Sequence, residues 1–498
     1  MSYPASVDAD NNGRMAIFAK GLAISSFLIY ATLIFVVPQI RDGRYCCEQS
    51  SFSAAISNIV YGSRIGAMYT GVFDIFIKHF TEPLPQALDE IRAELPTEPS
   101  GILSPTTLDG NGVGYPVVAT AAFRIFGFRW WAPAAVMLIL MAASTVIFLR
   151  RFPPLLVTLY FSCLTVMLFS WLVWEPAARG QIPVAGIRYF SLVGELPLFY
   201  ILLSLIQRRP FPDTKAVAAQ AAILMVSALA RGNAITAFGA IAVVGLVFSR
   251  ARRNIAVVRD LKTVILSSVV VVIIFALAVS PQYLTSGRFQ TIVWTRVLQG
   301  LGINPKLPIS ELNEMFPCQK YIPGGIPPGI DDQGSQCIWF AYVIEHNIPI
   351  ESLWNKSYGG EFDSAMRSAF FRIVARYPRE TLDTLISLKP RITIGSVAMT
   401  LQFKLSDYPP MAIALLVISL GLALAAAATS ARFVREAIVV SVSTLFTATA
   451  YLAAYANPWV TSDLTLYCLI LSGLATCATI GGVVGLVRHR KMECADGG

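Results

Sequence analysis

The chain has 498 residues, of which 55% are hydrophobic and only 14% are charged, whereas about 25% of the residues in a soluble domain are charged. Such a chain has too little polar surface to cover itself in water, and its mean hydropathy of +0.61 excludes a soluble globular domain. The formal net charge of +9 does not indicate nucleic-acid binding, because the basic residues gather in short loops and form no stripe interleaved with aromatic residues.

The first apolar run extends from Met15 to Pro38 and is long enough to cross a bilayer, which requires about 20 mostly apolar residues. A signal peptide is the alternative, but the run ends in Val-Val-Pro-Gln-Ile-Arg and offers no small-x-small cleavage site. We therefore expect an uncleaved anchor whose N-terminus lies in the cytoplasm.

Further apolar runs predict a bundle of membrane-spanning helices. Basic clusters such as Arg150-Arg151 and Arg488 to Lys491 follow alternate runs, as expected of cytoplasmic loops. With the first anchor, the pattern predicts an all-α polytopic protein of the inner (plasma) membrane, with about ten spans and both termini in the cytoplasm. The short apolar stretch 116–127 either dips into the bilayer or spans it. The runs are 132–149, 155–174, 187–206, 215–230, 233–249, 262–283, 411–429, 435–454 and 464–487.

Two large hydrophilic segments follow the first and the seventh predicted span, so we expect both on the exterior (periplasmic) face. In the first of them, 52–60 and 65–80 mix apolar and polar residues at helical spacing, which predicts amphipathic helices on the membrane surface. The expected parts of the chain are 1–38 (cytoplasmic tail and first span), 39–131 (first exterior loop), 132–283 (transmembrane bundle), 284–410 (large exterior segment) and 411–498 (C-terminal spans and cytoplasmic tail).

Four cysteines, Cys46, Cys47, Cys318 and Cys337, fall in the two exterior segments, where an oxidising compartment allows disulfides. Four cysteines allow three pairings. Cys318 with Cys337 is the simplest, because this bond closes a loop rich in glycine and proline. A metal site at these cysteines is less favoured, since no histidine is spaced to complete one.

Several chemistries are not predicted. The histidines, His79, His346 and His489, form no His-x-x-x-His or Glu-x-x-His pattern, so we expect no zinc hydrolase and assign no metal ligand. No Gly-x-x-x-x-Gly-Lys-Ser/Thr loop is present, which excludes ATP binding in the P-loop manner.

Charged residues within or beside the apolar runs are few, and Glu195 and Arg231 are the clearest cases. Arg231 lies between two apolar runs, which predicts a turn near the outer surface. A proton or ion relay requires several buried acids in succession, and we expect none here. This shortage of buried charge disfavours a transporter or lipid flippase, which we keep as the alternative to a membrane enzyme. A catalytically silent membrane scaffold is the third hypothesis.

Two acidic residues, Asp42 and Glu48, follow the first span within one or two helical turns of the membrane surface. A carboxylate in this place could take a proton from a hydroxyl that attacks an electrophile. Cations at the same level suit a lipid phosphate through charge-assisted hydrogen bonds, although each could also be an ordinary headgroup anchor. The candidate cations are Arg44, Arg64, Lys78, Arg288, Arg296, Lys389 and Arg391.

The order of these features resembles that of GT-C glycosyltransferases, the superfamily of protein O-mannosyltransferases and lipid A aminoarabinose transferases. In that superfamily an acidic motif shortly precedes an aromatic residue that opens a surface helix, and Glu48 takes this place four residues before Phe52. Residues 114–127 are similar to the family's Pro-x-Tyr-Pro, apolar helix and Phe-Arg-Leu-Phe-Gly stretch. Residues 228–231 resemble its Leu-x-x-Arg turn, and 362–389 are similar to a Tyr…Ile-x-x-x-Pro-x-x-Phe…Lys segment of bacterial members.

The resemblance implies transfer of a sugar from a polyprenyl-phosphate donor to a glycan, lipid or protein acceptor of the cell envelope, on the exterior face. It implies Glu48 or Asp42 as general base, direct displacement with inversion at the anomeric carbon, and Tyr115 among the substrate-binding residues. No cofactor is certain, and a divalent metal is optional across the superfamily. The sequence departs from the family where the usual catalytic Asp appears as Glu48, and where Ser462-Asp463 replaces an Arg-Tyr pair before the last spans.

Overall fold

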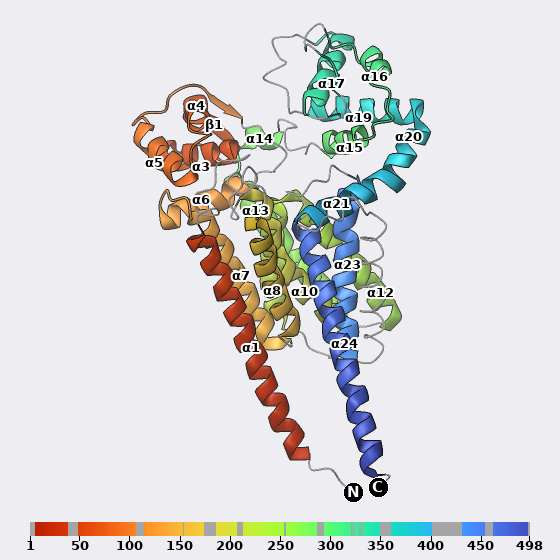
Figure 1. The fold of residues 1–498 in the computed structure, drawn as a ribbon. Coiled ribbons are helices and arrows are strands. Elements are labelled where there is room, and N and C mark those ends of the chain that lie inside the picture. The colour runs from red at the N-terminus through yellow and green to blue at the C-terminus, as the bar shows by residue number, and fades with distance from the viewer. Residues whose placement is uncertain are drawn as a thin grey trace.

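The computed structural model of this protein describes most of the chain, and helices dominate the described residues (Figure 1). One small sheet is present among them, in which β1 (Ala67–Tyr69) pairs antiparallel with β2 (Leu103–Pro105) and Ala67 lies opposite Pro105. The described residues are 5–37, 48–105, 114–152, 154–173, 186–206, 213–252, 255–285, 293–319, 322, 324–327, 330, 332–348, 360–400, 431–453 and 462–496.

Five helical stretches in the described residues are long and apolar enough to cross a membrane. The predicted class, an all-α polytopic membrane protein, is thereby confirmed, whereas the predicted span at 411–429 lies outside the described residues. The five stretches are Ile17–Val36 within α1 (Ala5–Val36), Ala132–Arg151 (α7), Tyr189–Ile206 (most of the 3-10 helix η1, Ile187–Gly194, with α10, Glu195–Ile206), Val257–Ala278 within α13 (Ile255–Ala278) and Ser462–Thr479 within α24 (Ser462–Asp496).

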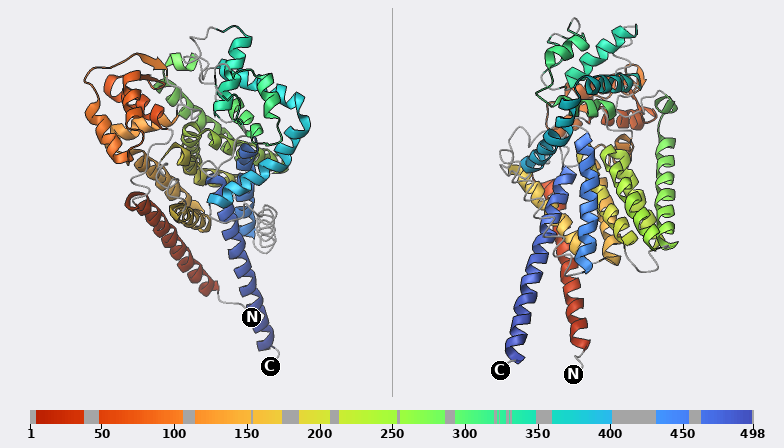
Figure 2. Two further views of the ribbon diagram at one scale, coloured as in Figure 1. Left: turned by 45° about the horizontal axis from the view of Figure 1, so that its top comes forward. Right: turned by 90° about the vertical axis from the view of Figure 1, so that its right-hand side faces the viewer.

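Other helices complete the bundle. They are α8 (Leu155–Val173), α11 (Thr214–Ala230), α12 (Thr236–Arg252) and α23 (Ala431–Ala453). The start of α1 and the end of α24 lie at the same end of the bundle (Figures 1 and 2). The remaining helices gather at the opposite end, where α24 begins, and we call this the loop end.

The first segment at the loop end contains α3 (Gln49–Tyr61), α4 (Thr70–Lys78), α5 (Leu84–Glu94) and α6 (Gly114–Phe126). Phe52 joins α3 to α4 and α6, because its ring lies 6.4 Å from that of Phe76 and 5.5 Å from that of Phe123. The helix expected over 65–80 begins only at Thr70, since 67–69 pairs as β1. At 13 residues, α6 is too short to span a bilayer.

The second segment has its own apolar core, which includes the fully buried Trp339 and Met366. A disulfide joins Cys318 to Cys337 across a Cα–Cα distance of 5.2 Å, and this is the pairing that the sequence favours. The segment consists of α15 (Val293–Gly302), α16 (Ile309–Met315), α17 (Asp332–Glu345), α19 (Gly360–Arg376), α20 (Pro378–Asp383), the π-helix η4 (Thr384–Leu388) and α21 (Lys389–Thr400). The short α14 (Pro281–Thr285) precedes it and lies beside the first segment, where Tyr283 packs against Gly66.

A glycine lets α6 dock on the bundle. Gly114, the first residue of α6, lies so close to the end of α11 that an added Cβ would be 2.2 Å from the carbonyl carbon and oxygen of Leu229. A backbone carbonyl cannot swing away as a flexible side chain can. Only glycine therefore permits this approach, which places Tyr115 beside the loop end of α11.

We expect Gly114→Ala to lower the free energy of unfolding by about 1–3 kcal/mol, because the methyl group would overpack a contact with backbone atoms. Thermal unfolding of the detergent-purified protein measures the change. Gly395→Ala in α21 is the control, because an added Cβ there meets nothing within 4 Å. A Gly114→Ala protein as stable as the unmodified chain would contradict the tight contact.

Candidate functional site

Glu48, one of the two predicted bases, lies immediately before α3 and is buried, with 1% of its surface exposed. Its carbonyl oxygen accepts a hydrogen bond from the amide of Phe52 at 2.9 Å, so the first turn of the helix fixes the residue. A helix N-terminus carries a partial positive charge that favours a carboxylate. The acid is thus held on a rigid element at the loop end and shielded from bulk water.

Tyr115 lies against the first turn of α3. Its ring stacks on that of Phe52 with the centroids 6.1 Å apart, and it is 1% exposed. Burial, and after it the negative charge of Glu48, holds the pKa of the Tyr115 hydroxyl well above its usual value. The hydroxyl therefore keeps its proton at neutral pH and remains a donor close to a carboxylate.

The ring of Tyr115 also reaches the bundle, where its centroid is 6.1 Å from that of Phe190 in η1. Ser227 of α11 donates a hydrogen bond from Oγ to the carbonyl of Phe190 at 2.9 Å. The helix α11 ends at Ala230, and the amide of the next residue, Arg231, donates a hydrogen bond to the Ser227 carbonyl at 2.8 Å. Arg231 therefore occupies a turn at the loop end, as the sequence predicts, and Gly114 packs on the residues just before it.

A second group of acids lies at the start of α10 and of α24. Glu195 and Asp463 are 6% and 3% exposed and lie close enough to interact electrostatically. The hydroxyl of Tyr467 donates to Glu195 Oε2, and that of Tyr451 to Asp463 Oδ1 at 2.5 Å. The charge of Arg231 also acts on Asp463. We call Glu195, Arg231, Tyr451, Asp463 and Tyr467 the polar cluster.

The polar cluster corrects one expectation, because the sequence suggested no succession of buried acids and the structure pairs two of them. The sequence does not predict this pairing because the two helices are far apart in the chain. Glu195 and its hydrogen-bond donor Tyr467, for example, are separated by 272 residues. A signal was nevertheless present. Each acid stands in the first turn of an apolar helix, and Tyr467 follows Asp463 by four residues, which places both on one helix face.

Among the predicted cations that the structure describes, Lys389 is the buried one, with 2% exposure. Burial lowers the pKa of its ammonium group to about 8. Ile392 and Val397 of the same helix pack against Tyr451 and Leu464, so Lys389 begins a helix that docks on the loop ends of α23 and α24. Its helix, α21, thus packs against the two helices that carry Tyr451 and Asp463.

The other predicted residues are dispersed or not described. Arg64 is exposed beyond the far end of α3 from Glu48. Arg296 is exposed on α15, where its Nη1 donates to Gln299 Oε1 at 2.9 Å, and Arg391 is exposed on α21. Lys78 is exposed at the end of α4, where its Nζ lies 2.6 Å from Glu94 Oε1. Asp42, Arg44 and Arg288 lie outside the described residues.

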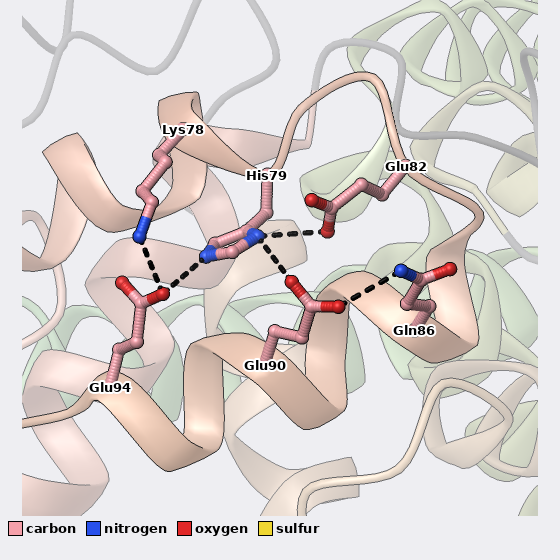
Figure 3. Close-up of polar contacts among 6 residues, drawn as sticks. All are labelled: Lys78, His79, Glu82, Gln86, Glu90 and Glu94. Carbon is pink, nitrogen blue, oxygen red and sulfur yellow. Dashed lines mark hydrogen bonds and ion pairs between the residues drawn. The ribbon is translucent and has the colours of Figure 1, made fainter.

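The structure brings together one group of potential metal-binding side chains that the sequence does not predict. Among the described residues, His79, Glu82 and Glu90 place their ligand atoms within 4.8 Å of one another, at the turn between α4 and α5 (Figure 3). Sequence reasoning missed it because the histidine and Glu90 stand on different helices, at a spacing that matches no common motif. This group is separate from Glu48 and from the polar cluster.

Comparisons with known proteins add little to this geometry. No protein-family model matches the chain, and no curated protein matches it. A solved structure described as ArnT from Cupriavidus metallidurans bound to undecaprenyl phosphate is similar over 92% of this chain and 78% of its own, at 12% identity and a TM-score of 0.30. A likeness of this size shows no family.

Proposed function

We propose that this protein is a GT-C-type membrane glycosyltransferase that moves a sugar from a polyprenyl-phosphate donor to an acceptor of the cell envelope. The observation that carries the proposal is the buried carboxylate of Glu48, fixed at the start of a helix that follows the first span. In this proposal the loop end faces the exterior of the inner membrane and both termini lie in the cytoplasm. The partners are then the polyprenyl-linked sugar, membrane lipids and a glycan, lipid or protein acceptor.

Glu48 acts as the general base. It takes the proton of the acceptor hydroxyl while that oxygen attacks the anomeric carbon of the sugar. The new carbon–oxygen bond forms as the bond between the anomeric carbon and the phosphate oxygen breaks, and polyprenyl phosphate leaves with the electron pair. Attack opposite to the leaving group inverts the anomeric centre.

The leaving phosphate gains negative charge, which cations in a water-poor site stabilise far more strongly than cations in bulk water do. The charge of Arg231 acts on Asp463 at the start of α24, and Lys389 is the first residue of α21, which docks there through Ile392 and Val397. We assign the phosphate to these two cations. Gly114 packs on Leu229 and Ala230, the two residues directly before Arg231. Arg231 is therefore also close in the chain to the contact that positions Tyr115. The exposed Arg64, Arg296 and Arg391 suit lipid headgroups.

A proton-coupled transporter is the second candidate, and the paired acids Glu195 and Asp463 favour it, because buried acids within spans commonly relay protons. The candidates differ in what Glu195 does. In the enzyme, Tyr467 and Glu195 hold α10 against α24 and Glu195→Gln leaves sugar transfer in place. In a transporter, the same substitution abolishes proton-linked uptake.

The proposal is tested with Glu48→Gln, which keeps the shape of the side chain and removes its basicity. We expect sugar transfer to fall by about 10²–10⁴-fold, as for loss of a general base. The assay follows the release of free polyprenyl phosphate from polyprenyl-phosphate sugars in the presence of cell-envelope extract, by mass spectrometry.

Glu98→Gln is the matched control, because Glu98 is an exposed acid of the same segment, and it should transfer as the unmodified protein does. Asp42→Asn is assayed in parallel. Full transfer by Glu48→Gln would exclude Glu48 as the base, and loss of transfer in Asp42→Asn alone would move that role to Asp42.

The pKa of Lys389 predicts how donor binding depends on pH. With a pKa of about 8, the protonated fraction of Lys389 falls from about nine-tenths at pH 7 to about one-tenth at pH 9. We expect the KM for the donor to rise up to about tenfold over this range, because only the charged amine binds phosphate. In Lys389→Arg the charge persists and the rise should disappear. An identical pH dependence in both proteins would contradict the assignment.

A further inference from the structure

His79 directly follows α4 as its C-cap residue and is surrounded by carboxylates from the turn and from α5 (Figure 3). Its side chain is 4% exposed. Glu82 Oε2 lies 2.8 Å and Glu90 Oε2 lies 3.0 Å from the ring nitrogen Nδ1, while Glu94 Oε1 lies 3.0 Å from Nε2. A buried imidazole thus faces three acids, two of them at the same nitrogen.

The imidazole ring has fewer hydrogens than acceptors around it, because three carboxylate oxygens face its two nitrogens. A ring nitrogen carries at most one hydrogen, so Nδ1 cannot give a well-directed bond to both Glu82 and Glu90. Nε2 faces Glu94, which Lys78 also holds at 2.6 Å. When Nε2–H donates to Glu94, Nδ1 presents a lone pair to two carboxylate oxygens, and the repulsion among these three atoms is relieved by a cation between them.

We propose that His79 Nδ1, Glu82 and Glu90 bind a divalent transition-metal ion of the Zn²⁺ type. Imidazole with carboxylates is a ligand set that such ions accept. Glu94 plays the part of the carboxylate that orients a metal-binding histidine through its other ring nitrogen. Gln86 donates from Nε2 to Glu90 Oε1 at 2.9 Å and so fixes the second oxygen of that ligand.

The ion would join α4 to α5 across the turn. Glu82 and Glu90 are 28% and 40% exposed, which leaves a path from solvent to the ligands, while His79 anchors the ion on the buried side. Phe76 of α4 packs against Phe52 of α3, so a fixed α4 also supports the helix that begins at Glu48. The inference does not depend on the proposed sugar transfer.

The test uses the full-length protein in detergent, stripped with EDTA, freed of chelator and titrated with zinc chloride in a calorimeter. We expect one zinc ion per chain and a rise in the melting temperature with zinc. Glu90→Gln should weaken binding by about tenfold or more, and Glu94→Gln by about 10–100-fold, as for loss of a group that orients a ligand. Both residues are partly exposed, so both variants should fold.

Asp89→Asn is the matched control, since Asp89 is an exposed neighbour on α5 and its substitution changes the charge equally. It should bind zinc and gain thermal stability as the unmodified protein does. Absence of zinc binding by the unmodified protein would show that a proton on His79 satisfies the acids instead. Equal binding by Glu90→Gln would show an adventitious surface ion, and either result overturns the proposal.

Discussion

Carboxylates buried at the loop end of a membrane bundle constrain the rest of this structure. A charged group shielded from water is tolerated only where hydrogen bonds or opposite charges replace its solvent. Tyr467 meets this demand at Glu195, and Tyr451 and Arg231 meet it at Asp463. The ends of α10, α23 and α24 are therefore joined by hydrogen bonds as well as by apolar packing.

Glu48 extends the same constraint into the first non-spanning segment. It is buried beside Tyr115, and Tyr115 can reach this place because Gly114 lies against the backbone of α11. Two elements thus bring a potential base to the part of the bundle that holds Arg231. In a reaction that creates negative charge on a lipid phosphate, a base and a cation in such low-polarity surroundings both gain effect. The proposed sugar transfer requires a base and a cation arranged in this way.

The sequence predicts what depends on local composition. Apolar runs of sufficient length mark spans such as Ala132–Arg151, and the position of Glu48 after the first anchor marks a candidate base. It does not predict contacts between distant segments, such as Glu195 with Tyr467, because neither residue carries a local sign of its partner. The strand at 67–69 is a second example. Its local sequence pattern predicts a helix, but its pairing with the distant residues 103–105 makes it a strand. The sequence does not predict the group of metal-type ligands around His79, because a turn between two helices, rather than the spacing along one helix, brings these ligands together.

The most direct measurement is an experimental structure of the detergent-purified protein with bound polyprenyl phosphate. The account predicts that the phosphate lies at the loop end, in contact with Arg231 or Lys389, with Glu48 facing the position that the sugar would occupy. Phosphate bound at the end where α1 begins, or at the loop end with Glu48 turned away from it, would contradict the account.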